Sequence, residues 1–128
     1  MTAGGNGIVV SQCTWSVISN NTVADNEYVG ISVTLCEGAI VKSNRVQRNE
    51  NGILVSQSPG GIISNNTVRD NEQVGIGVSS CDGAMVKRNL GNGNGQGIAV
   101  DHSLACSVGF NSVVFNHSSG IDLSVIEG

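Results

Sequence analysis

Apolar and polar residues alternate in short segments that recur every 22 or 23 residues along the chain. Each recurrence opens with glycine and isoleucine, and a valine or leucine follows two residues after the isoleucine. The glycines that open these repeats are Gly7, Gly30, Gly52, Gly75, Gly97 and Gly120. With the glycine counted as position 1, the apolar residues at positions 2 and 4 are separated by variable residues. Because every second residue of a β-strand faces the same side, this alternation predicts a strand that is buried on one face.

Two further apolar segments follow the first one in most repeats. One is a pair at positions 11 and 12, as in Val17-Ile18, and the other is a valine at position 17, as in Val23. Three short strands per repeat are typical of a coil with three parallel faces. The 18 glycines and the lack of helical periodicity exclude a helical solenoid. We therefore expect an all-β fold, a right-handed single-stranded parallel β-helix of five to six rungs, with residues 1–128 as one domain from a longer solenoid.

Two series of asparagines keep the same spacing as the glycines. The series at position 15 consists of Asn21, Asn44, Asn66, Asn89 and Asn111. The series at position 20 consists of Asn26, Asn49, Asn71, Asn94 and Asn116. Equivalent residues on successive rungs lie roughly 4.8 Å apart, so each side-chain amide can donate to one neighbour and accept from the other. We interpret both series as ladders at corners, where asparagine also tolerates a left-handed backbone; solvated loop asparagines are the alternative.

The pattern Gly-Ile-x-Val in one strand, followed by Asn-x-Val-x-x-Asn through the next corner, resembles the right-handed parallel β-helix repeat family. This group includes pectate lyase-like, NosD-like and alginate epimerase-like proteins, described as carbohydrate-binding and sugar-hydrolase domains. The resemblance covers residues 4–126 and rests on structural residues, so it indicates a fold more than an activity. It implies an extracellular or cell-surface location and contact with polysaccharide.

Composition and charge exclude several other classes of protein. The net charge is −4, and six lysines and arginines without a basic cluster give little support for nucleic-acid binding. The apolar runs are too short for membrane insertion, and residues 1–6 are too short and too rich in glycine for a signal peptide. Lys42 and Lys87 share position 13 but lie two rungs apart, so we interpret the basic residues as a solvated face.

The best candidates for catalysis are Asp101, His102 and Asp122. The resemblance implies that a lyase or epimerase would place its base and its charge-neutralising group on outward positions of neighbouring rungs. Asp101 at position 5 and Asp122 at position 3 are expected to face outward, with His102 beside the former. We favour the alternative that these residues are solvated and have no catalytic role.

Acidic residues also recur in the turns, at Asp25, Glu27, Glu50, Asp70 and Glu72. They could bind Ca²⁺ between rungs, but we favour turn capping and expect no cofactor.

The cysteines do not follow a zinc-binding pattern. Cys13, Cys36 and Cys81 all occupy position 7, where serine replaces cysteine in two other rungs, and Cys106 lies outside this column. Cys13 and Cys36 belong to adjacent rungs, close enough for a disulfide. We favour reduced thiols packed inside a bend, with the disulfide as the alternative.

The regular repeat and the lack of convergent titratable groups favour a non-catalytic β-helix scaffold or a glycan-contacting module. The alternative is a fragment of a polysaccharide lyase, hydrolase or epimerase that acts on acidic polysaccharide. We also expect the chain to associate with itself. Ile121 and Leu123 would lack a covering rung, which favours end-to-end contact, and an outward apolar column offers a lateral contact instead. This column consists of Val17, Ile40, Ile62 and Met85.

Overall fold

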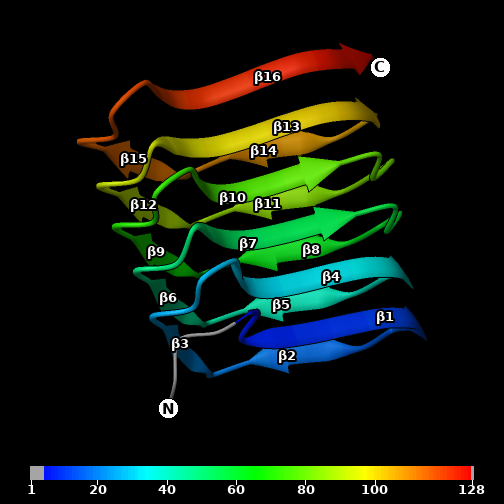
Figure 1. Cartoon of the computed structure of the whole chain (residues 1–128). Helices are drawn as coiled ribbons and strands as arrows, with labels where there is room; N and C mark the ends of the chain where they lie inside the picture. The colour runs from blue at the N-terminus through cyan, green and yellow to red at the C-terminus, as the bar shows by residue number, and fades with distance from the viewer. Residues whose placement is uncertain (1–4, 128) are drawn as a thin grey trace.

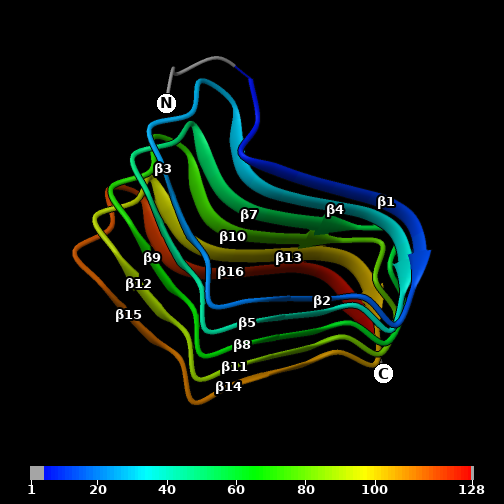
Figure 2. The same ribbon diagram turned by 90° about the horizontal axis from the view of Figure 1, so that it is seen from below.

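The computed structural model describes residues 5–127, and within this range the chain consists of strands and turns. Three parallel sheets wind around one axis as a β-solenoid, with each rung stacked on the one before (Figure 1). Viewed from below, the sheets form three sides of a coil around a narrow interior (Figure 2). The predicted all-β parallel solenoid is confirmed. No helix among the described residues has the length and apolar character needed to cross a membrane.

Each sheet is built from the same strand of successive rungs. Sheet A contains β1 (Ile8–Thr14), β4 (Val29–Glu37), β7 (Asn51–Ser56), β10 (Val74–Ser79), β13 (Gln96–Leu104) and β16 (Ser119–Glu127). Sheet B contains β2 (Val17–Ser19), β5 (Ile40–Lys42), β8 (Ile62–Ser64), β11 (Met85–Lys87) and β14 (Ser107–Gly109). Sheet C contains β3 (Thr22–Ala24), β6 (Arg45–Gln47), β9 (Thr67–Arg69), β12 (Leu90–Asn92) and β15 (Ser112–Val114). The three segments expected in each repeat therefore correspond to the three sheets.

The core is a set of columns in which equivalent residues stack along the axis. In sheet A, Ile31 pairs with Ile53 and Ile53 pairs with Ile76, and each of these side chains is 0% exposed. Val41 of sheet B and Val46 of sheet C point into the same interior and are also buried. The expected register is confirmed, and burial of these aliphatic columns is the main stabilising contribution to the fold.

The glycine at position 1 is required for space. A Cβ at Gly30 would lie 2.8 Å from the carbonyl oxygen of Gly52 and 2.9 Å from Nδ2 of Asn49. Gly75 meets the equivalent groups of Gly97 and Asn94, each at 2.7 Å. The backbone of one rung therefore passes so close to the next that no side chain fits between them.

Both asparagine ladders form as expected. Asn44 donates from its backbone N–H and from Nδ2 to Oδ1 of Asn66, each at 3.1 Å, and Nδ2 also donates to the carbonyl oxygen of Ile18 at 3.0 Å. In the second ladder, Nδ2 of Asn71 donates to Oδ1 of Asn94 at 2.9 Å. Each interior amide thus satisfies its own polar atoms and a backbone group at the corner.

The left-handed residue of each corner is not the ladder asparagine itself. The residue before the ladder takes a positive φ instead, as in Ser43 (57°) and Asn65 (56°) at one corner and Asp25 (63°) and Arg48 (58°) at the other. This single left-handed residue turns the chain, so that the following asparagine points inward. Such a backbone costs about 1–3 kcal/mol for a residue other than glycine, which the hydrogen bonds of the ladder offset.

Candidate functional site

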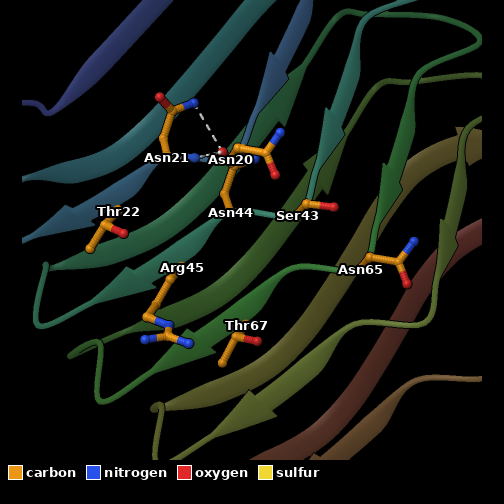
Figure 3. A pocket seen from close by; sticks show the side chains of 8 residues that line it. All are labelled: Asn20, Asn21, Thr22, Ser43, Asn44, Arg45, Asn65 and Thr67. Carbon is orange, nitrogen blue, oxygen red and sulfur yellow. Dashed lines mark hydrogen bonds between the residues drawn. The ribbon is translucent and has the colours of Figure 1, made fainter.

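The corner at which each strand of sheet B leads into a strand of sheet C, which we call the B–C corner, carries a polar groove of about 410 Å³. The residues that line it are Asn20, Asn21, Thr22, Ser43, Asn44, Arg45, Asn65 and Thr67. Figure 3 shows that the outer side chains form two rows, each of which runs from one rung to the next. One row consists of Asn20, Ser43 and Asn65, and the other consists of Thr22, Arg45 and Thr67.

The local backbone explains why these side chains face solvent. Asn20 has a φ of 60° and directly precedes the ladder asparagine Asn21. Because Asn21 points inward to bond Asn44, the side chain of Asn20 remains exposed. In the next strand, Thr22 faces outward and Val23 faces the core, as the alternation of a strand requires. The same rule repeats on the following rungs.

The outer side chains of the groove are free to bind a ligand. Among the eight residues drawn in Figure 3, all in the described part of the chain, the only hydrogen bonds that involve a side chain run from Asn21 to Asn44. Asparagine offers two donors and an acceptor, serine and threonine offer a donor and an acceptor, and Arg45 offers five donors. The groove therefore presents donors and acceptors on three successive rungs.

The two rows continue beyond the groove onto the next two rungs. Arg88 and Phe110 extend the first row, and Leu90 and Ser112 extend the second. The guanidinium carbon of Arg88 lies 5.6 Å from the centroid of the Phe110 ring, within the range of a cation–π contact. Phe110 is 87% exposed, so the free face of its ring is open to a ligand.

A second groove, of about 360 Å³, crosses the outer face of sheet A. It is hollow because the outward positions of two neighbouring strands carry the small residues Gly77 and Ala99. Leu54 lies over Gly77, where a Cβ would come within 2.7 Å of its Cδ2 atom. The polar side chains that line this groove are Ser32, Ser56, Ser79, Gln96 and Asp101.

The candidate catalytic residues lie on or beside this second groove. Asp101 is half-buried, and its Oδ1 lies 3.5 Å from Nδ1 of His102, which is exposed. Asp122 is exposed on β16, and its Oδ2 accepts a hydrogen bond of 3.4 Å from Gln96. The outward direction expected for both aspartates is therefore found, and Asp101 lies beside His102. A catalytic role for these three residues stays a prediction.

The acidic turn residues surround an arginine. Nε of Arg48 lies 2.7 Å from Oδ1 of Asp25, and its second nitrogen donates to Oδ2 at 3.1 Å. Hydrogen bonding between the two side chains lowers the pKa of Asp25 and raises the pKa of Arg48. The negative charge of Asp70 also raises the pKa of Arg48, by a smaller amount. Glu27, Glu50 and Glu72 line a pocket together with Arg48 and Asp70. Among residues 5–127 no group of three side chains is arranged to hold a metal ion, and Ca²⁺ binding stays untested.

The favoured expectation of reduced thiols was wrong for one pair of cysteines. A disulfide joins Cys13 and Cys36, whose Cα atoms are 4.5 Å apart because adjacent rungs bring position 7 into register. Cys81, in the same column, is a buried free thiol whose pKa is raised by burial. Cys106 is a partly exposed free thiol. Where serine occupies this column, its hydroxyl accepts the backbone N–H of the rung before, as Ser103 does for Cys81 at 2.9 Å.

The sequence analysis did not find the groove at the B–C corner. The signal was present in the segment Ser-Asn-Asn-Thr, which occurs at residues 19–22 and again at 64–67. The periodicity assigns the second asparagine of this segment to the ladder and indicates no role for its first asparagine or for its threonine. These two residues are the ones that face solvent and line the groove.

Comparisons with known proteins agree with this architecture. The family described as "Right handed beta helix region" matches residues 1–125. No curated protein matches the sequence. Among solved structures, the crystal structure of the periplasmic alginate epimerase AlgG is similar, with a TM-score of 0.69 and 19% sequence identity. The likeness covers 96% of this chain but 36% of the epimerase, so it shows the fold alone. The repeat, the three parallel sheets and the family match together place the chain in the right-handed β-helix family.

Proposed function

We propose that the chain is a non-catalytic glycan-contacting β-helix module, and that the groove at the B–C corner is its binding surface. The observation that carries the proposal is the set of six outward side chains in this groove that make no hydrogen bonds with one another. A sugar ring presents several hydroxyl groups, each of which both donates and accepts. Asparagine, serine and threonine side chains match this chemistry because they also offer both functions.

The solenoid suits a polymer better than a small molecule. The two rows place polar side chains on three successive rungs, so an extended glycan that lies along the axis would meet hydrogen-bonding groups at each rung of the groove. The groove is open to solvent, and it does not enclose a ligand on all sides as small-molecule sites do. The similarity to a structure named as an alginate epimerase supports a carbohydrate ligand at the level of the fold.

Binding of soluble polysaccharides to the 128-residue chain, measured by affinity electrophoresis and calorimetry, tests the proposal. Thr22→Ala removes one hydroxyl from the groove. Because a neutral hydrogen bond contributes about 0.5–1.5 kcal/mol, the affinity should fall roughly 2- to 12-fold. Thr14→Ala is the matched control, since Thr14 is an exposed threonine on the same rung outside the groove. Equal effects of the two variants, or no binding by the parent chain, would contradict the proposal.

The second candidate is a fragment of an enzyme that acts on acidic polysaccharide. The specific observation in its favour is that Asp101, beside His102, lines the groove on sheet A. Release of an unsaturated, ultraviolet-absorbing product from a uronic acid polymer, lost in Asp101→Asn, would favour this candidate. Binding at the B–C corner without turnover would favour the module.

A further inference from the structure

The basic residues of this acidic chain gather on one side of the coil. Positions 10 to 18 of the five rungs, which comprise sheets B and C and the corner between them, contain five lysines and arginines and no aspartate or glutamate. These segments are residues 16–24, 39–47, 61–69, 84–92 and 106–114. The remaining basic residue, Arg48, and all ten acidic residues lie elsewhere. We call this part of the surface the basic side.

The cations of the basic side are available to a ligand. Four of the five side chains are exposed and Lys87 is half-buried. Arg48 is the only lysine or arginine among residues 5–127 that forms an ion pair, and it is not part of the basic side. The cations of the basic side are Lys42, Arg45, Arg69, Lys87 and Arg88.

At the B–C corner, charged rungs alternate with neutral ones. Lys42 pairs with Ser64, and Ser64 pairs with Lys87, so two strand spacings separate the lysines. The equivalent corner positions of the third rung hold the uncharged Asn65 and Thr67, and the arginine of this rung, Arg69, lies beyond the corner at the last residue of β9. The first rung is also neutral here, with Asn20 and Thr22, and the fifth has Phe110 and Ser112. The second and fourth rungs therefore each carry two cations, about 9.5 Å apart along the axis.

This spacing points to the charge pattern of the ligand. A distance of two rungs is similar to the length of one disaccharide in an extended glycan. From this spacing we infer that the B–C corner binds an acidic glycan with one carboxylate or sulfate per disaccharide, lying along the axis. The inference rests on the proposed function and names its ligand class. Each acidic group meets the cations of a charged rung, and each neutral sugar meets the hydroxyl and amide groups of a neutral rung.

The experiment compares three polymers of matched length at about 0.15 M salt, where charges separated by more than about 8 Å are screened. Hyaluronate has one carboxylate per disaccharide, polygalacturonate has one per sugar, and an unbranched β-glucan has none. We expect hyaluronate to bind most tightly and the neutral glucan most weakly. On a polygalacturonate chain, every second carboxylate would face corner positions that carry no cation, where it loses hydration and gains no adjacent counter-charge.

Arginine variants test the position of the site. Because an exposed ion pair contributes about 0.2–1 kcal/mol, Arg45→Gln and Arg88→Gln should each weaken hyaluronate binding roughly 1.5- to 5-fold. Arg48→Gln is the matched control, since it removes the same charge from a different corner and should leave hyaluronate binding unchanged. Asn65→Arg adds a cation to the neutral third rung and should narrow the preference for hyaluronate over polygalacturonate.

The outcomes separate this inference from the proposed function. If the neutral glucan binds as tightly as the acidic polymers, or if polygalacturonate binds most tightly, the inference is overturned and the glycan-contacting function stands. If none of the three polymers binds, both are overturned. Duplex DNA serves as a further polyanion, and tighter binding of DNA than of hyaluronate would also overturn the inference.

Discussion

At the scale of single residues, the repeat is maintained by contacts between one rung and the next. Gly75 has no room for a side chain, because the backbone of the following rung lies against it. Asn66 accepts two hydrogen bonds from the rung before it and donates to the rung after it. The residue type at each of these positions is restricted by contacts with the equivalent position one rung away. The glycines and asparagines therefore recur with the period of the coil.

Replacement of Gly75 by alanine should lower the free energy of unfolding by about 1–3 kcal/mol, because the new Cβ would press on the backbone oxygen of Gly97. Urea unfolding followed by circular dichroism measures the change. Gly109→Ala is the control, since a Cβ there would have no neighbour within 4 Å. A loss of similar size in both variants would show that close rung spacing is not the reason for glycine at position 1.

Replacement of Asn66 by alanine should lower the free energy of unfolding more than replacement of an asparagine outside the ladders. The change leaves the backbone N–H of Asn44 and the carbonyl of Val41 without their side-chain partner. Each unsatisfied buried group costs about 1–3 kcal/mol. Asn92→Ala, in a half-buried position of β12, is the comparison and should change stability little. The same urea titration should therefore place the Asn66 variant well below the Asn92 variant in midpoint.

At the scale of elements, the strands of the first two rungs are joined covalently. The disulfide between Cys13 and Cys36 links β1 to β4 at the end of sheet A. Directly after the ends of these two strands, the ring of Trp15 lies against Gly38, so the same turn is also held by packing. Among the described residues β1 pairs with β4 alone, and the disulfide adds a covalent link to the pairing of these two strands.

Reduction of this disulfide should lower the free energy of unfolding by about 3 kcal/mol, the value expected for a loop of this length. The fluorescence of Trp15, the only tryptophan of the chain, reports unfolding beside the bond. In the double variant Cys13→Ser and Cys36→Ser, a reductant should have no further effect. Thiol labelling of the unfolded parent chain without reductant should find two free cysteines, and four would contradict the bond.

The remaining two thiols should differ in reactivity. Cys81 is buried, and burial raises its pKa, so little of the reactive thiolate forms near neutral pH. Cys106 is partly exposed. In the folded protein a thiol reagent should therefore modify Cys106 first, which mass spectrometry of the labelled peptides can establish. Faster labelling of Cys81 would mean that the fourth rung opens readily.

At the scale of the whole molecule, the fold could be predicted from the periodicity of the sequence, but the groove at the B–C corner could not. The spacing of Ile53 and Asn66 from their equivalents determines the register, so strands, core and ladders follow from the sequence. The groove depends on which way Asn65 faces, and that direction is set by a left-handed backbone that the side chain does not require. The two-rung spacing of Lys42 and Lys87 follows from the sequence, whereas their place beside the groove follows from the pairing of the strands of sheet B.

The last described rung of the coil is the basis for the prediction of self-association. Ile121 and Leu123 of β16 are 46% and 52% exposed, whereas Ile98 and Val100, one rung earlier in the same columns, are almost completely buried. Among the described residues β16 pairs with β13 alone, so its other edge has free hydrogen-bonding groups. Exposed apolar side chains next to an unpaired strand edge favour pairing with another chain.

Sedimentation velocity of the 128-residue chain should therefore reveal oligomers whose fraction rises with protein concentration. Leu123→Lys should reduce this association, because a charge on the exposed end must be desolvated when two coils meet. Val17→Lys serves as the comparison for a lateral contact, since Val17 is 55% exposed on the outer face of sheet B. A larger effect of Val17→Lys would assign the contact to that face. A monomer at all concentrations would contradict both the end-to-end and the lateral arrangement. The stacked core of the interior rungs would then be sufficient to keep the chain folded and soluble with β16 uncovered.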